Sequence, residues 1–266
     1  MQQLLIYLAT GALAGVLAGL FGVGGGVIMV PALALVLPTQ GVPAAVVMQV
    51  ALGTSLAVIA ITSISSTLAH QRRGGVRWDI LLRFAPGLAI GAIAGAYVAD
   101  HLNAGELKRT FGIGAVLISA QMFSGWQPRG LDEAAAPRTP ELLGVGGLIG
   151  LLSSLIGIGG GSLTVPYFSA RGLAMREAVG TAAASGMPIA WAGAIGFMLA
   201  GAGHGTAALP DFSVGYVNLA AFFGLAVAST ATAPVGARLA HTLPPQQVKR
   251  AFAILLLSTG LKMLLA

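Results

Sequence analysis

The stretch LFGVGGGVIMVP, residues 20–31, interrupts an apolar segment with three consecutive glycines. A glycine inside a helix costs about 1 kcal/mol relative to alanine, so three in a row break the helix that the flanking residues favour. The same pattern returns as LIGIGGGSLTVP, residues 155–166, again with a proline five residues after the last glycine. The repetition indicates a structural feature that the chain uses twice.

The composition predicts a membrane protein. Of the 266 residues, 56% are hydrophobic and only 8% are charged, whereas a soluble domain carries about 25% charged residues. A helix needs about 20 mostly apolar residues to span a bilayer. Apolar runs follow one another along the chain: residues 4–37, 44–69, 80–99, 110–125, 142–170, 178–200, 212–237 and 251–266. They predict an all-α polytopic membrane protein that contacts the lipid bilayer.

The chain also carries an internal duplication. When Pro31 is aligned with Pro166, the glycine triplets coincide, and Gly53-Thr54 and Lys108-Arg109 find matches in the same order at Gly180-Thr181 and Lys249-Arg250. Transporter folds are often built from such repeats. We expect an N-terminal repeat over residues 1–124, a polar linker over 125–141, and a C-terminal repeat over 142–266, all within one membrane domain.

The basic residues distinguish two topologies. If each glycine segment were a single crossing, the 14 Lys and Arg residues would divide evenly between the two sides and give no orientation. If each segment is a hairpin that turns at its glycines, only Lys108, Arg109 and Lys262 lie on one side and the other 11 lie opposite. Because cytoplasmic loops are enriched in Lys and Arg, the hairpin topology is favoured.

The hairpin topology makes the two repeats inverted. Each repeat then has a helical hairpin, with one full and one short arm, followed by three transmembrane helices. The central linker is predicted to be cytoplasmic and both termini non-cytoplasmic. A net charge of +6 is explained by these loops, and no basic run with interleaved aromatic residues indicates nucleic-acid binding.

The hairpin tips are candidate anion sites. Each arm that follows a triplet has about 11 residues, roughly 16 Å or half a bilayer, so two helix N-termini would meet near the midplane. Their free N–H groups and partial positive charge favour an anion. Neutral side chains nearby add donors. The candidate substrate-binding residues are Gly24, Gly25, Gly26, Gly159, Gly160, Gly161, Ser162, Thr54, Ser55, Thr181, Gln49 and Ser185.

Structural alternatives stay open for these residues. Glycine in a membrane helix often only permits close packing, and this interpretation is favoured for Gly11, Gly15, Gly19, Gly91 and Gly95. Serine and threonine often bond to their own helix or to a neighbouring one. No carboxylate is expected deep in a helix, and the four His do not have metal-ligand spacing. We therefore expect no catalytic site, no metal and no cofactor.

Several motifs resemble a known family. GLFGVGGGVIMVPAL, ALGTS, RRGGVRWD and the second copy LIGIGGGSLTVPYF are similar to the TauE/SafE family of sulfite exporters, also grouped as the 4-toluene sulfonate uptake permease family. The second copy has Ala182 where the first has Ser55. The resemblance implies a transporter in the bacterial cytoplasmic (inner) membrane that carries sulfite, thiosulfate, sulfoacetate or another organosulfonate.

The predicted function is export of such an anion, bound at the midplane by helix N-termini. A transporter of another small anion such as a carboxylate, or a non-transport membrane subunit or enzyme, remains the alternative. The sequence is also compatible with a homodimer. A membrane enzyme would need polar catalytic groups or metal ligands inside the membrane, which the sequence does not offer.

Overall fold

The computed structural model describes residues 2–21, 26–124, 138–203, 209–210, 212–242 and 244–265. The chain forms the following elements: α1 (Gln2–Phe21), α2 (Gly26–Val36), the 3-10 helix η1 (Leu37–Gln40), α3 (Val47–Arg72), α4 (Trp78–His101), α5 (Ala104–Ser124), α6 (Thr139–Ile156), α7 (Gly161–Ala170), α8 (Met175–Ala202), β1 (Ser213–Val214), β2 (Val217–Asn218), α9 (Leu219–Thr242) and α10 (Pro245–Leu265). The two short strands pair antiparallel. Helix α6 begins at Thr139, so residues 139–141 of the predicted linker are helical.

The described part of the chain contains five helices that are long and apolar enough to span a membrane. They are α3, α4, α6, α8 and, over Leu219–Gly236, α9. Helices α5 and α10 each have 21 residues, about 31 Å of helix, but their first turns are polar. The predicted fold class, an all-α polytopic membrane protein, is confirmed.

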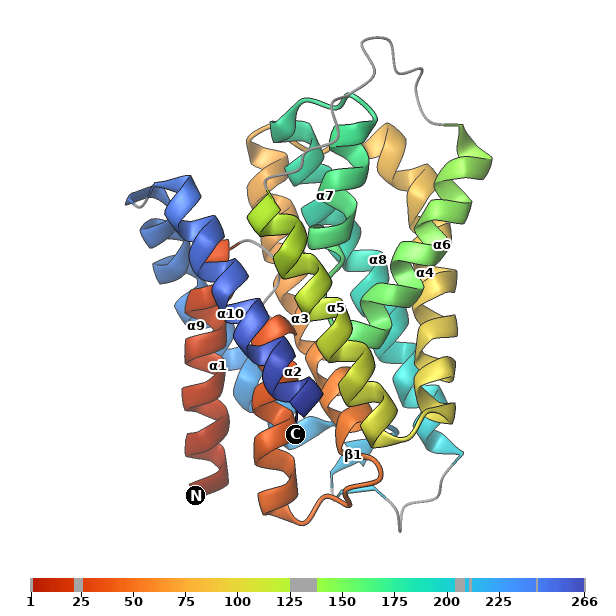
Figure 1. Ribbon diagram of the computed structural model, residues 1–266, viewed down its shortest axis with the longest axis vertical. Coiled ribbons are helices and arrows are strands. Elements are labelled where there is room, and N and C mark those ends of the chain that lie inside the picture. Colours follow the sequence, from red (N-terminus) through yellow and green to blue (C-terminus); the bar gives the residue numbers. More distant parts are fainter. Residues whose placement is uncertain are drawn as a thin grey trace.

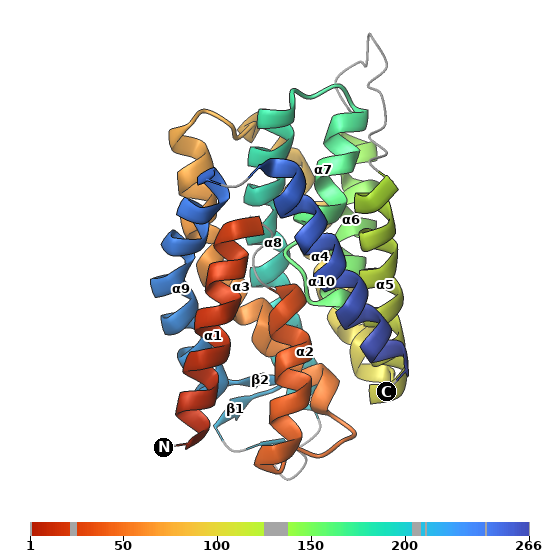
Figure 2. The same ribbon diagram turned by 60° about the vertical axis from the view of Figure 1, so that its left-hand side comes forward.

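The helices run between two ends of an elongated bundle. Figures 1 and 2 place the N- and C-termini at the same end, and α1 runs away from that end while α2 returns toward it. Helices α6 and α7 do the reverse, because α6 enters from the opposite end and α7 goes back to it. Which end faces the cytoplasm stays a prediction, as does the descent of the two halves from one inverted repeat.

The two short arms are the helices α2 and α7. They begin at Gly26 and Gly161, one residue earlier than the sequence predicts, and have 11 and 10 residues. Pro31 and Pro166 lie inside them. Each proline lacks the N–H that would bond to the carbonyl four residues earlier, so both arms are weakened at matching positions.

Glycines let the outer helices pack closely. A Cβ on Gly91 of α4 would lie 1.9 Å from the carbonyl oxygen of Gly147 in α6, and one on Gly15 of α1 would lie 2.4 Å from that of Ser229 in α9. Gly11 and Gly95 face neighbouring backbones in the same way. The packing interpretation is therefore confirmed for these four glycines, while the surroundings of Gly19 lie outside the described residues.

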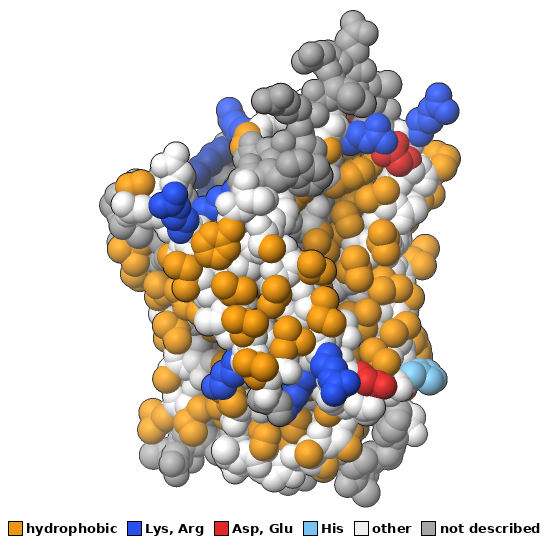
Figure 3. Space-filling model, viewed as in Figure 1, with side chains coloured by type: hydrophobic (Ala, Val, Ile, Leu, Met, Phe, Trp, Pro, Cys, Tyr) orange, Lys and Arg blue, Asp and Glu red, His pale blue; other side chains and the backbone are white. Residues whose placement is uncertain are grey.

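Helices α3 and α8 form the centre of the bundle. In α3, 83% of the most apolar 18-residue window is buried, more than in the other four candidate spans. The surface is apolar along its middle, and Lys and Arg side chains gather above and below this band in the face drawn in Figure 3. The first half of α3 is almost wholly buried and α8 is more than half buried, so both helices can present side chains to the glycine turns.

Candidate functional site: the glycine turn between α6 and α7

Two glycines with positive φ reverse the chain between α6 and α7. Gly157 ends α6 with a φ of +68°, and Gly160 precedes α7 with a φ of +76°. Residues with a Cβ rarely adopt this conformation, whereas glycine does so readily. These two positions therefore fix the turn, which we call the second tip and define as residues 157–162.

The second tip presents backbone donors. The carbonyl oxygen of Gly160 accepts hydrogen bonds from the N–H groups of Leu163 and Thr164, at 3.0 and 2.9 Å, and from the Thr164 hydroxyl at 2.8 Å. The N–H groups of Gly161 and Ser162, at the start of α7, have no acceptor within the helix. This end of α7 also carries the positive part of the helix dipole.

Open space and unused hydroxyls lie beside these donors. Within the part of the chain that the structure describes, a Cβ on Gly161 would meet no atom within 4 Å. Among the described residues, the buried hydroxyl oxygens of Ser153 and Ser162 have no hydrogen-bond partner. Ser153 is 1% exposed, and its hydroxyl oxygen would lie 3.4 Å from a Cβ on Gly160. Buried polar groups are nearly always paired, so two unpaired hydroxyls at one turn indicate a place for a ligand.

Sequence reasoning did not select Ser153. The available signal is the Ser153-Ser154 pair, which stands in otherwise apolar sequence one turn before Gly157. The corresponding positions in the first half are Ala18 and Gly19. At these two positions, therefore, only the second half of the chain has hydroxyl side chains.

The first tip touches the second. Gly24 and Gly25 lie outside the described residues. Gly26 begins α2, and a Cβ on it would lie 2.1 Å from the carbonyl oxygen of Gly157. The hydroxyl of Ser55 donates to the same oxygen at 3.3 Å. The structure thus brings Gly26 and Ser55 of the first half to the second tip.

Helix α8 lies against the other side of the second tip. A Cβ on Gly186 would lie 3.1 Å from the carbonyl oxygen of Gly159. The neighbouring candidate, Ser185, is fully buried and donates to the carbonyl of Thr181 in its own helix at 2.9 Å. Ser185 is therefore close to the tip in sequence, but its hydroxyl bonds to α8 itself.

Thr54 and Thr181 bond to loops of the opposite half. Thr54 Oγ1 accepts a hydrogen bond from the backbone N–H of Asn218, and Thr181 Oγ1 accepts one from that of Arg77, both at 3.0 Å. The glycine before each threonine admits the approaching loop. A Cβ on Gly53 would lie 2.6 Å from the carbonyl oxygen of Tyr216. One on Gly180 would lie 2.2 Å from that of Gly75.

Gln49 joins α3 to the end of α4. Its amide nitrogen donates to the carbonyl oxygens of Ala99 at 3.4 Å and Leu102 at 2.8 Å. The structure therefore places Gln49 at a helix end and not among the tip contacts.

In the part of the chain that the structure describes, every Asp and Glu side chain belongs to a residue within three positions of a helix end. Asp79 pairs with Arg77 at 2.9 Å, and Glu177 pairs with the same guanidinium at 3.5 Å. Asp100 accepts a hydrogen bond of 2.7 Å from the Tyr216 hydroxyl, and burial of this phenol raises the pKa of Tyr216 above its ordinary value. In the described ranges, no group of three His, Asp or Glu residues could hold a metal. The donors at the second tip are thus neutral.

Comparison with known proteins identifies the family. The model of the sulfite exporter TauE/SafE family matches residues 7–263. The chain belongs to this family. It is 34% identical to a probable membrane transporter protein of Haemophilus influenzae, over 98% of both chains. It is 26% identical to one of Methanocaldococcus jannaschii, over 98% of this chain and 95% of that protein. No solved structure matches significantly.

Membership in the TauE/SafE family decides the class of protein. The relatives are named probable membrane transporter proteins, and with the family match they make this chain a membrane transporter and not an enzyme. A third relative, the probable membrane transporter protein YunE of Bacillus subtilis, is 34% identical over 62% of this chain and 67% of its own. The predicted family is confirmed.

Proposed function

We propose that this TauE/SafE transporter exports a small sulfur-containing anion such as sulfite, thiosulfate, sulfoacetate or another organosulfonate. The observation that supports this most directly is the second tip, where Ser153 and Ser162 carry unpaired buried hydroxyls beside the first N–H groups of α7. Such a set of donors, with open space in front of Gly161, suits a compact oxyanion.

Neutral donors fit a substrate that must be released. An oxyanion that enters the site exchanges its water hydrogen bonds for those of backbone N–H groups and hydroxyls. Hydrogen bonds to a charged group contribute about 1.5–3 kcal/mol each, enough for selective binding. A buried Lys or Arg would hold the anion more strongly and slow its departure. N–H donors recognise charge and size, so several sulfur oxyanions of similar size can be carried.

The two tips have unequal roles in this proposal. The first turn of α2 reads Gly26-Val27-Ile28-Met29, whereas the first turn of α7 reads Gly161-Ser162-Leu163-Thr164. Polar donors therefore gather on the second tip, and Gly26 closes against it at Gly157. Gly24, Gly25, Gly26, Gly159, Gly160, Gly161, Ser162 and Ser55 remain proposed substrate-site residues, now with Ser153. We propose that Thr54, Thr181, Gln49 and Ser185 position the helices around the site.

The proposed orientation follows from the basic residues. The helix ends opposite the termini carry most of the Lys and Arg residues, so the positive-inside rule assigns that end, with the linker, to the cytoplasm of a bacterial cell. An anion that leaves an inside-negative cell gains about 2.3 kcal/mol per charge per 100 mV. Export can thus run without a proton relay. Relative movement of the two halves would expose the site to each side in turn.

Transport in proteoliposomes tests the proposal. Purified protein is reconstituted into vesicles loaded with sulfite, thiosulfate, sulfoacetate or, as a control, acetate, and efflux is followed under an imposed membrane potential. We expect faster efflux of at least one sulfur anion than from protein-free vesicles, and no acceleration for acetate. Efflux of acetate alone would favour a carboxylate transporter instead. Acceleration of neither class would refute an anion site at the second tip.

A further inference from the structure

A cavity separate from the second tip lies at the end of the molecule where the termini are. It has a volume of about 510 Å³ and is lined by residues of α2, the start of α3, the start of α5 and the end of α10. Most of its lining residues are apolar, with Ala34, Met48, Met263 and Leu264 among them, but about half of the exposed lining surface is polar. This volume falls in the range of about 300–1,000 Å³ that is typical of ligand sites. The second tip does not contribute to it.

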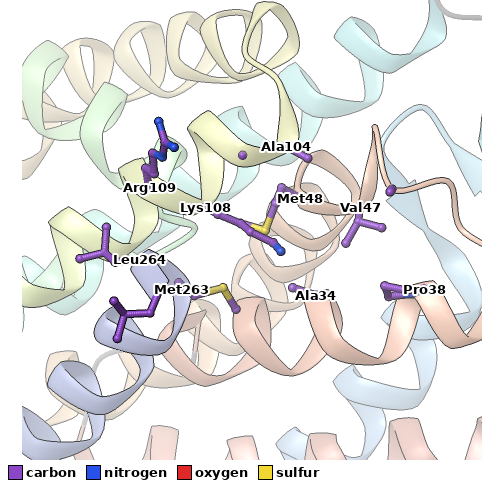
Figure 4. A pocket seen from close by; sticks show the side chains of 12 residues that line it. Ala34, Pro38, Val47, Met48, Ala104, Lys108, Arg109, Met263 and Leu264 are labelled. Carbon is purple, nitrogen blue, oxygen red and sulfur yellow. The ribbon is translucent and has the colours of Figure 1, made fainter.

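Two cations, Lys108 and Arg109, line this cavity, and Lys108 points into it. Figure 4 shows the Lys108 side chain directed between Met48, Met263 and Ala34, whereas the neighbouring Arg109 points away from them. Lys108 is half-buried. A lysine at a membrane boundary usually extends its ammonium group toward water. The inward direction of Lys108 therefore calls for a partner within the cavity.

The described lining offers no carboxylate for Lys108. None of the residues around the cavity is an Asp or a Glu. The nearest acid in sequence, Glu106, caps its own helix: its carboxylate accepts from the Asn103 N–H at 2.8 Å, and its N–H donates to the Asn103 side chain at 2.9 Å. An ammonium group among apolar side chains without a counter-charge is unfavourable. An anionic ligand would supply that charge.

The surroundings favour a lipid over a free ion. The cavity is lined by residues of α2, α3, α5 and α10, and in Figure 3 the basic side chains at this end border the apolar band that covers α5 and α10. A small hydrated anion gains nothing from the methionine and leucine walls. An acyl chain does gain, at about 0.8 kcal/mol for each buried CH₂ group.

We propose that this cavity binds an acidic phospholipid, with its headgroup phosphate at Lys108 and the start of an acyl chain along Met48 and Met263. The start of α5 adds the positive end of a helix dipole beside the phosphate, because Ala104 and Gly105 also line the cavity. The site is independent of the proposed transport activity.

Native mass spectrometry of the full chain in detergent tests this site. The protein is stripped of lipid and titrated with phosphatidylglycerol, phosphatidylcholine or inorganic phosphate. We expect phosphatidylglycerol to bind at least about tenfold more tightly than phosphatidylcholine. Lys108→Gln should lose most of that preference. Lys262→Gln is the matched control, because Lys262 is an exposed cation on α10 at the same end but does not line the cavity.

A second variant separates the cavity from the charge. Ala44, between η1 and α3, is an exposed lining residue, so Ala44→Trp should reduce the cavity volume without disturbing the buried core, and Lys108 is kept. We expect it to weaken phosphatidylglycerol binding about as much as Lys108→Gln does. Equal binding of both lipids, equal losses in the Lys108 and Lys262 variants, or an Ala44→Trp variant that binds normally would overturn the proposal. Displacement of the lipid by inorganic phosphate alone would assign the cavity to a free anion instead.

Discussion

The backbone N–H of Asn218 donates a hydrogen bond to Thr54 Oγ1 over 3.0 Å, and this contact joins the two halves of the protein. It has a counterpart of the same length between Arg77 and Thr181. Asn218 directly precedes α9, and Arg77 directly precedes α4. Each central helix therefore holds the start of a long helix in the opposite half.

These contacts predict a positioning role for both threonines. Thr54→Val and Thr181→Val keep the shape of the side chain but leave a buried backbone N–H without its acceptor, which should lower stability by about 1–3 kcal/mol. We expect a lower midpoint of thermal unfolding in each variant and an unchanged KM for the transported anion. A KM that rises while the unfolding midpoint stays at the wild-type value would assign these hydroxyls to the substrate.

For the unpaired hydroxyls at the second tip we predict the opposite result, which is unchanged stability and weaker anion binding. Ser153→Ala and Ser162→Ala remove groups that have no partner in the protein, so stability should be unchanged or slightly higher. Each variant should bind the anion about 10- to 100-fold more weakly, because it loses a hydrogen bond to a charged group. Isothermal titration with sulfite or thiosulfate measures both affinities.

Ser169→Ala is the control for these two variants. Ser169 is another serine of α7 whose buried hydroxyl has no partner among the described residues, but it lies two turns beyond Ser162. We expect its affinity for the anion to equal that of the wild type. A loss as large as in Ser162→Ala would mean that any unpaired hydroxyl of α7 has this effect, and the site would no longer be localised.

The proposed orientation predicts which residues can be labelled from outside the cell. The chain has no cysteine, so single substitutions give clean probes. Lys262→Cys, at the end where the termini lie, should react with a membrane-impermeant maleimide on intact cells. Arg73→Cys, in the loop between α3 and α4 at the opposite end, should react only after permeabilisation. The reverse pattern would place the termini in the cytoplasm.

Much of the fold could be predicted from the sequence. The glycine triplets and the prolines after them gave the positions of α2 and α7 to within one residue, because backbone conformation at glycine and proline depends on the residue itself. The long apolar runs likewise predicted the five described helices, α3, α4, α6, α8 and α9, that are long and apolar enough to span a membrane. The boundary between the linker and α6 was predicted after residue 141 but lies before Thr139, since a polar first turn of a helix resembles a linker in sequence.

The partners of individual side chains could not be predicted in this way. Thr54 and Asn218 are 164 residues apart, and nothing in a local pattern tells whether a threonine accepts from a distant loop or faces a ligand. The sequence around Ser153 predicts an ordinary apolar helix, and only the turn of the chain at Gly157 brings Ser153 to the second tip. The inward direction of Lys108 likewise depends on how α5 packs against α10 and α3.

The most direct test of the anion site is transport by Gly161→Leu. A Cβ at Gly161 meets no described atom within 4 Å, so the variant should fold, and its side chain would occupy the space proposed for the substrate. Gly144→Leu in α6 is the matched control, because a Cβ there also meets nothing within 4 Å and the position is exposed. In proteoliposomes, we predict that Gly161→Leu abolishes efflux of the sulfur anion while Gly144→Leu retains it. Wild-type efflux by a correctly inserted Gly161→Leu protein would contradict substrate binding at the second tip.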